Sequence, residues 1–291
     1  MLGNTGQAVA SRVDRGGAGG VLTAIDRNTS KPSRLSTRRI EGAAVNFLHH
    51  RDGVSNYYHY LAERCVVMAE VLGLVTDEAP NLTLLTREGM AGIEQIYLNQ
   101  ILRRFPGVRV QTVAPTEKIV CDQLFQHRVR RNSGFRSPPT AASLTAVADT
   151  FESAYGLAPP APPHRRLLVS REDARIRRLV GEDALMTALA PLGFERICPG
   201  QLAHEAQIAL FREAAWVIGA HGAGLTNLMF MPAGGRVIEI FSEDYCQGAY
   251  MWLSHLRQLD YTPVVTSTMG AHQTITLSAA DIEAIRRLVA D

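Results

Sequence analysis

The sequence of 291 residues has no apolar run that approaches the roughly 20 residues needed to cross a bilayer as a helix. Its first twenty residues also lack the continuous apolar stretch of a secretory signal peptide. We therefore expect a cytoplasmic protein. Peripheral association with a membrane surface stays open, because a small basic patch is sufficient for it.

The sequence contains few cysteines and has a small net charge. The four cysteines, Cys65, Cys121, Cys198 and Cys246, include no C-x-x-C pair, which excludes a zinc knuckle or a dithiol redox motif. The 30 basic and 28 acidic residues leave a formal net charge of +2, too balanced for a protein whose whole surface binds nucleic acid. We therefore expect a folded protein with reduced thiols and no nucleic-acid partner.

The length of the chain favours two domains. Residues 1–39, rich in Gly, Ser, Thr and Arg with little periodicity, are expected to form a flexible N-terminal extension. Residues 40–158 are predicted to form an N-terminal domain and residues 164–291 a C-terminal domain, joined by the proline-rich segment GLAPPAPPHRR that starts at Gly156.

Strands and helices alternate in both predicted domains. The C-terminal domain offers strands at RLLVS, FERIC, WVIGA and RVIEIF with helical segments between them, which predicts an α/β fold with a parallel, doubly wound sheet. In the N-terminal domain we expect a strand at 43–48, then a helix that begins with Ser55 as its N-cap and ends at Gly73.

A glycine-rich turn, GAHGAG, follows the strand WVIGA. Gly219, Gly222 and Gly224 are expected to adopt backbone angles that other residues avoid and to bring the main chain close to a ligand. The helix that follows would present unpaired N–H groups at its N-terminus, so a diphosphate is the natural ligand of Gly222, Ala223 and Gly224. The spacing differs from the dinucleotide motif G-x-G-x-x-G.

Two polar residues near this turn each have two readings. His221 can donate to a phosphate oxygen, or it can brace the turn. Glu239 lies among apolar residues at the end of the next strand, where its carboxylate needs a partner. That partner is either the ribose of a nucleotide or a nearby salt bridge or helix cap.

A second set of candidate site residues lies at the end of the strand RLLVS. Ser170 and Arg171 lie at its carboxyl end, and the planar guanidinium of arginine suits phosphate oxygens. Arg175 and Arg178, further along the same charged segment, are expected to face solvent.

The segments SNYYHYLAER, SREDARIRR and AQIALFREAAWVIGAHGAGLTNLMFMPAGGRVIEIF together resemble glycosyltransferase family 61 in kind, order and spacing. The resemblance implies GT-B architecture, in which two Rossmann-like domains face a cleft. It implies an acceptor side in the N-terminal domain and a nucleotide-sugar site in the C-terminal domain, lined by Ser170, Arg171, His221 to Gly224 and Glu239.

The resemblance also implies inverting, metal-independent transfer of a hexosyl or pentosyl group from a nucleotide-diphosphate sugar, expected to be UDP-linked. The acceptor would be a glycan or another hydroxyl compound, with polysaccharide biosynthesis as the setting. The absence of any D-x-D pair favours the route without a metal, so no cofactor is expected. The oligomeric state stays open.

For the catalytic base we propose His59 with Glu63, four residues apart and therefore on one helix face. The alternative is a hydrogen-bonded core histidine beside an ordinary surface carboxylate. A hydrolase with a nucleophile elbow is disfavoured, because the turn carries His221 and no serine. A nucleotide-sugar-binding or scaffold protein without turnover remains the alternative function.

Overall fold

The computed structural model describes residues 13–15, 20–23, 36–47, 56–76, 81–90, 92–114, 117–127, 140–266 and 273–290. Ser55, predicted as an N-cap, lies outside these residues, as does most of the predicted extension at 1–39. The chain divides into two compact units, Met1–Ala154 and Tyr155–Asp291. Residues 157–164 form neither helix nor strand.

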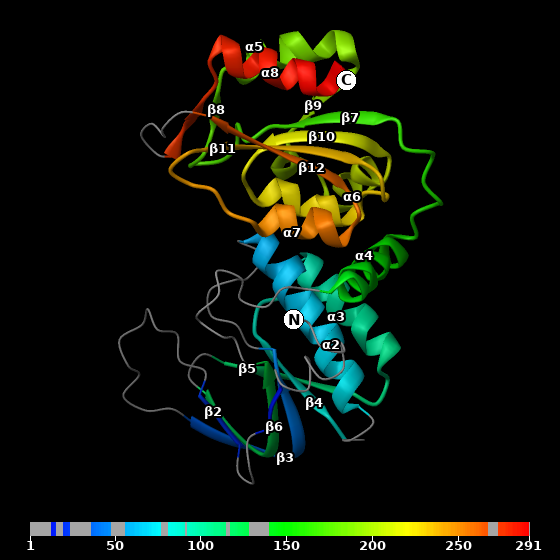
Figure 1. Cartoon of the computed structure of the whole chain (residues 1–291). Helices are drawn as coiled ribbons and strands as arrows, with labels where there is room; N and C mark the ends of the chain where they lie inside the picture. Colours follow the sequence, from blue (N-terminus) through cyan, green and yellow to red (C-terminus); the bar gives the residue numbers. More distant parts are fainter. Residues whose placement is uncertain are drawn as a thin grey trace. The chain divides into compact units, whose positions relative to one another are not determined.

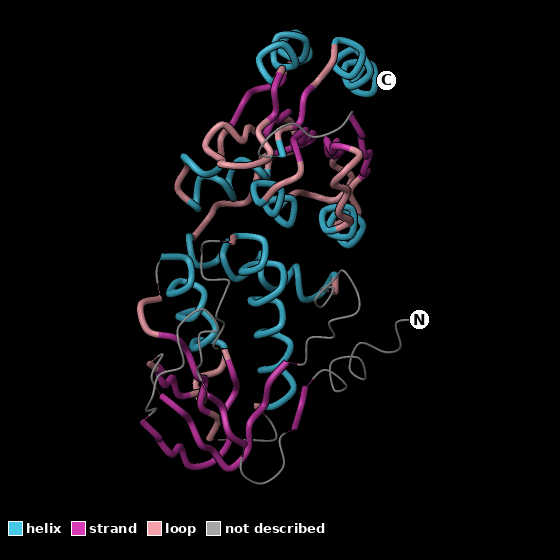
Figure 2. Tube along the Cα trace, turned by 90° about the vertical axis from the view of Figure 1, so that its left-hand side faces the viewer, coloured by secondary structure: helices cyan, strands magenta, loops and turns pink. Residues whose placement is uncertain are grey.

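The N-terminal unit contains a mixed sheet with its helices on one side (Figures 1 and 2). The sheet order is β1-β6-β3-β4-β5; β3 pairs in parallel with β6 and β4, β4 pairs in parallel with β5, and β1 and β2 run antiparallel to β6. The elements of this unit are β1 (Val13–Arg15), β2 (Gly20–Thr23), β3 (Ser36–Asn46), η1 (His59–Cys65), α2 (Val66–Val75), β4 (Thr83–Arg87), α3 (Gly92–Arg104), β5 (Arg109–Val113), β6 (Glu117–His127) and α4 (Ala141–Tyr155).

Four features of this unit differ from the sequence prediction. Strand β3 begins at Ser36, seven residues before the predicted start at Ala43, and β1 and β2 lie in the segment expected to be a flexible extension. The first helix is π-helical from His59 to Cys65 before it becomes α-helical. It also passes through Gly73 to Val75, because burial of Val75 in the core offsets the cost of about 1 kcal/mol for a helical glycine.

The C-terminal unit is a three-layer α/β structure. Its strands are all parallel in the order β12-β11-β10-β7-β9, with α5 and α8 on one face and α6 and α7 on the other (Figure 1). Its elements are β7 (Arg165–Val169), β8 (Leu179–Val180), α5 (Glu182–Leu189), η2 (Ala190–Leu192), β9 (Phe194–Ile197), η3 (Pro199–Gln201), α6 (His204–Arg212), β10 (Ala214–Ala220), η4 (Ala223–Phe230), β11 (Arg236–Ser242), α7 (Ala249–Leu256), β12 (Asp260–Thr266), β13 (Ile275–Thr276) and α8 (Ala279–Ala290).

The parallel sheet of the C-terminal unit confirms that part of the predicted fold. Strands β10 and β11 are buried along nearly all of their length, as their continuous apolar sequences indicated. Side chains from the sheet, α5 and α8 form one apolar core, which includes Leu185, Ile218 and Ile285. No helix in the described part of the chain is both long and apolar enough to cross a bilayer.

Candidate functional site

Two motifs that are far apart in the sequence meet where the strand order of the C-terminal sheet reverses. Strand β7 is first in the chain, yet it lies between β9 and β10, so the direction of the connections changes between β7 and β10. Arg171 follows β7, and His221 and Gly222 follow β10. Ligands of open α/β sheets bind beyond the carboxyl ends of the strands at such a reversal.

The guanidinium of Arg171 occupies the space that a side chain at Gly222 would need. A Cβ atom built on Gly222 would lie 1.5 Å from Nη1 and 2.3 Å from Cζ of Arg171. The φ angle of Gly222 is 169°, an extended conformation open to any residue. Any larger residue at this position would therefore displace the guanidinium of Arg171, although the backbone itself would accept it.

The other two glycines of the turn are also explained by packing. A Cβ atom on Gly219 would lie 3.0 Å from Cβ of Val169, and one on Gly224 would lie 3.2 Å from Cγ1 of Val169. None of the three has a φ in the left-handed region. The prediction of unusual backbone angles was therefore wrong: these glycines let β7, its loop and the turn approach each other.

Arg171 is held by its own loop. Its Nε donates to the carbonyl of Arg177 and its Nη2 to the carbonyl of Ile176, both at 3.1 Å. Its Nη1, which lies over Gly222, makes no hydrogen bond to any residue that the structure describes. Burial, and then the charge of Arg177, lowers the pKa of Arg171 from its ordinary value. The result is a fixed cation with one unused edge at the glycine turn.

His221 is fixed by a buried carboxylate. Its Nδ1 lies 2.6 Å from Oε1 of Glu239, whose side chain has no exposed surface. The hydroxyl of Tyr261 donates to the other oxygen of Glu239, also at 2.6 Å. Burial raises the pKa of Glu239, and the hydrogen bonds from His221 and Tyr261 partly offset that rise. Strands β10, β11 and β12 thus each contribute one member of a hydrogen-bonded chain.

The structure shows the second of the two kinds of partner considered for Glu239, a group of the protein itself. Both of its carboxylate oxygens are hydrogen-bonded within the protein, and its side chain is fully buried. A contact between Glu239 and the ribose of a nucleotide stays a prediction. His221 itself is only 8% exposed, and its ring stacks on Phe241 with the centroids 5.4 Å apart.

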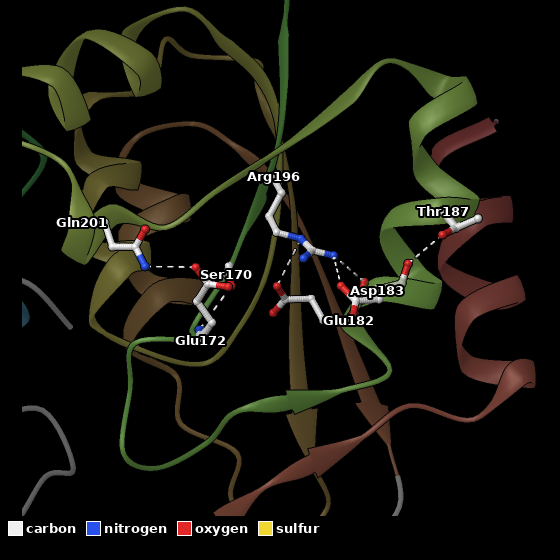
Figure 3. Close-up of polar contacts among 7 residues, drawn as sticks. All are labelled: Ser170, Glu172, Glu182, Asp183, Thr187, Arg196 and Gln201. Atoms are coloured by element: carbon white, nitrogen blue, oxygen red, sulfur yellow. Dashed lines mark hydrogen bonds and ion pairs between the residues drawn. The ribbon is translucent and has the colours of Figure 1, made fainter.

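Ser170 shapes the loop that carries Arg171. Its hydroxyl accepts a hydrogen bond from the backbone N–H of Glu172 at 3.2 Å, and the carboxylate of Glu172 accepts one from Gln201 at 3.0 Å (Figure 3). On the neighbouring strand β9, Arg196 pairs with Asp183 at the start of α5 (Figure 3). Ser170 is 2% exposed, so its observed role is to fix the loop, and a contact with ligand stays a prediction.

The short helix η4 begins directly after Gly222. It is a 3₁₀-helix, and its residues from Leu225 to Phe230 are all buried. The backbone N–H of Leu225 donates to the carbonyl of Gly222 at 2.9 Å. The first N–H groups of a helix have no partner within it, and those of Ala223 and Gly224 therefore border the turn that Arg171 covers.

In the N-terminal unit, His59 and Glu63 are in contact, as their spacing predicted. Nδ1 of His59 lies 2.8 Å from Oε2 of Glu63, and their side chains are 30% and 17% exposed. Both lie on the π-helical segment η1. The π-helix is rare, and π-helical turns are frequently found at functional sites. The catalytic role of this pair stays a prediction.

The sequence analysis did not single out Arg177, Tyr245 or Tyr261. The guanidinium of Arg177 lies over the ring of Tyr245 at 5.1 Å, and that ring contacts His221 edge to face with a centroid separation of 5.5 Å. Neither tyrosine belongs to a recognisable motif, and Arg177 was one arginine among several. Arg175 and Arg178 are exposed, as predicted.

The described residues contain no group of three or more His, Cys, Asp or Glu side chains that could hold a metal ion.

The arrangement defines the class: an α/β protein with a cationic, glycine-lined turn at the reversal point of a parallel sheet. Residues 57–238 match the family "Glycosyltransferase 61". That match spans more than half of the chain, which therefore belongs to glycosyltransferase family 61.

Two relatives of this chain are glycosyltransferases by name. It is 42% identical over 55 residues to beta-1,2-xylosyltransferase RCN11 of Oryza sativa subsp. japonica, covering 19% of this chain and 10% of that protein. It is 32% identical over 109 residues to the EGF domain-specific O-linked N-acetylglucosamine transferase of Drosophila melanogaster, covering 34% and 20%. The matched regions thus span a fifth or less of these relatives.

A solved structure also shows a weak likeness. The dodecameric iron-containing heptosyltransferase TibC, in complex with ADP-D-beta-D-heptose, aligns with a TM-score of 0.32 and 13% identity, covering 84% of this chain and 68% of that one.

Proposed function

We propose that this chain is an inverting, metal-independent glycosyltransferase that takes a sugar from a nucleotide-diphosphate donor, expected to be UDP-linked, to a hydroxyl acceptor such as a glycan. One observation carries the proposal. In a chain of glycosyltransferase family 61, Arg171 and His221 lie at the carboxyl ends of the two strands between which the strand order reverses. Membrane association and a GT-B cleft are further expectations of the same proposal.

The leaving group is a diphosphate that gains negative charge as the bond to the sugar breaks. Stabilising that charge needs donors fixed in advance, because a preorganised donor costs nothing to reorient during the reaction. Arg171 offers Nη1 at the turn, and the first N–H groups of η4 lie beside it. These groups supply the charge that a divalent cation would otherwise provide.

His221 can donate a hydrogen bond to a phosphate oxygen only through a ring nitrogen that carries a proton. With its Nδ1–H donated to Glu239, the opposite Nε2 carries a proton only when the ring is an imidazolium. We propose that Glu239 acts as a positioning residue, which holds Nδ1 of His221 and so orients the ring toward a phosphate oxygen.

The base takes the proton of the acceptor hydroxyl while the oxygen attacks the anomeric carbon and the diphosphate leaves with the bonding electrons. We propose His59 for this step. Glu63 accepts from Nδ1 of His59, which leaves the lone pair on Nε2 of the neutral ring. One direct displacement of this kind inverts the anomeric centre.

Binding of the donor is tested by calorimetry with UDP. Arg171→Ala and His221→Ala are each expected to weaken binding at least tenfold, about 1.4 kcal/mol. Arg175→Ala removes the same charge from an exposed position in the same loop and is expected to leave the affinity unchanged. If both site variants bind UDP as tightly as the natural protein, the assigned site is wrong.

Turnover is tested separately, by release of UDP from UDP-sugars with and without glycan acceptors. Activity is expected to survive EDTA and to be lost in His59→Gln. Binding of a donor without any release of UDP would instead support the non-catalytic scaffold. Complete loss in EDTA with recovery on adding Mn²⁺ would refute the metal-independent mechanism.

A further inference from the structure

Arg177 is a second cation beside the glycine turn. Arg171 donates directly to the carbonyl of Arg177, so the two residues belong to one hydrogen-bonded loop. Arg177 is also linked to His221, because the ring of Tyr245 contacts both of these side chains. The guanidinium of Arg177 therefore belongs to the same neighbourhood as Arg171 and His221, the two residues of the proposed diphosphate site.

Within the described part of the chain, no carboxylate pairs with the charge of Arg177. Its Nε is buried and has no hydrogen-bond partner among the residues that the structure describes. Among the described residues, neither Arg171 nor Arg177 forms an ion pair with a carboxylate. The strongest charge acting on Arg171 is that of Arg177, and the opposite charge of Asp173 is weaker. Two partly buried like charges repel each other, and an anion bound between them would relieve that repulsion.

The backbone of Arg177 is strained as well. Its φ angle is +58°, in the left-handed region that costs a non-glycine residue about 1 kcal/mol or more. An ordinary φ would turn the side chain in another direction. The structure thus holds Arg177 in an unfavourable conformation that places its guanidinium on Tyr245.

From these contacts we infer that Arg177 is a second arginine of the diphosphate site, and that the two arginines receive the diphosphate together with His221. The inference rests on the proposed function of the site. A diphosphate at neutral pH carries enough negative charge for both guanidinium groups, and binding relieves their mutual repulsion. The ring of Tyr245 supports the guanidinium of Arg177 in this position.

Inorganic pyrophosphate is the appropriate probe, because it presents the diphosphate without base or sugar. Its affinity for the full chain is measured by calorimetry at fixed salt. Arg177→Gln is expected to weaken binding at least tenfold. Arg175→Gln makes the same change of charge in the same loop, at an exposed position, and is expected to change the affinity less than twofold.

Arg177→Gly separates binding from folding. Glycine adopts a φ of +58° without strain, so this variant should melt at the same temperature as the natural protein or higher. It should still lose at least tenfold in pyrophosphate affinity, and pyrophosphate should raise its melting temperature less than it raises that of the natural protein.

The outcomes distinguish this inference from the proposed function. If both Arg177 variants bind pyrophosphate normally while Arg171→Ala binds it weakly, the inference is wrong and the site stands. If Arg171→Ala also binds normally, the site itself is misplaced. If the natural protein binds UDP but no pyrophosphate, the role given to Arg177 is likewise overturned, because the diphosphate alone would then not be recognised.

Discussion

The substitution Gly222→Ala tests the contact on which the site depends. The added methyl group would fall 1.5 Å from Nη1 and 2.3 Å from Cζ of Arg171, so the guanidinium must leave its position. The backbone at Gly222 is extended, and alanine adopts it without strain. The substitution therefore acts on Arg171 and on little else.

The expected magnitude follows from what Arg171 loses. Its guanidinium is the end of a flexible side chain and can swing away, giving up two hydrogen bonds to carbonyl groups. At about 0.5–1.5 kcal/mol each, this lowers the free energy of unfolding by about 1–3 kcal/mol. Loss of the cation from the turn should weaken UDP binding about 10- to 100-fold, or about 1.4–2.8 kcal/mol.

A double-mutant cycle isolates the contact. In an Arg171→Ala background the methyl group at position 222 meets no guanidinium, so Gly222→Ala should then cost almost nothing in UDP affinity. The coupling energy is therefore expected to equal the whole effect of the single substitution. Calorimetry on the four proteins gives this value directly.

Gly224→Ala is the matched control. A Cβ atom there would approach Val169 and Pro199 and not Arg171, so its effect should add to that of Arg171→Ala. The explanation of the glycine turn fails if Gly222→Ala lowers UDP affinity equally with and without Arg171. It fails as well if Gly222→Ala leaves the affinity of the natural protein unchanged.

Further predictions concern the C-terminal unit, which holds both tryptophans, so fluorescence follows its unfolding in urea. Burial lowers the pKa of His204 from 6.5 to about 4, so the unfolded state binds a proton before the folded state does as the pH falls. The free energy of unfolding should therefore fall by about 2 kcal/mol between pH 7 and pH 5, and by less in His204→Gln. Calorimetry should show that Glu239→Gln weakens UDP binding about tenfold and that Tyr261→Phe weakens it two- to threefold. Because both residues act through His221, neither substitution should change the affinity in a His221→Ala background. Ser278→Ala removes the acceptor for the N–H of Asp281 at the start of α8 and should lower the free energy of unfolding by about 1 kcal/mol, whereas Ser278→Thr should not.

The parallel sheet of the C-terminal unit was predictable because burial on both faces leaves a readable pattern. Strands β10 and β11 are continuous apolar runs with helices on either side. Strand β12 was missed for the opposite reason. It is an edge strand that pairs only with β11, most of its residues are partly exposed, and it contains Pro263, which a central strand does not tolerate.

The positions of the site residues were predictable, but their partners were not. Arg171 and His221 could be placed at strand ends from local pattern alone. The partner of Glu239 depends on the register of β10 against β11, which sets Gly219 opposite Glu239 and so brings His221, two residues further on, to the same face. Register is a property of the assembled sheet, and no local pattern specified it.

Because local sequence does not specify partners, the position of the glycine turn was predicted correctly but the reason for its glycines was not. A glycine in a sequence indicates either an unusual backbone angle or an absent side chain, and the two look alike. At Gly222 the absent side chain is what matters, since the space belongs to an arginine from the loop after another strand. The unused edge of Arg171 therefore faces the turn only when both loops have folded around the reversal between β7 and β10. It follows that unfolding either loop should abolish anion binding even if every residue of the other loop stays in place.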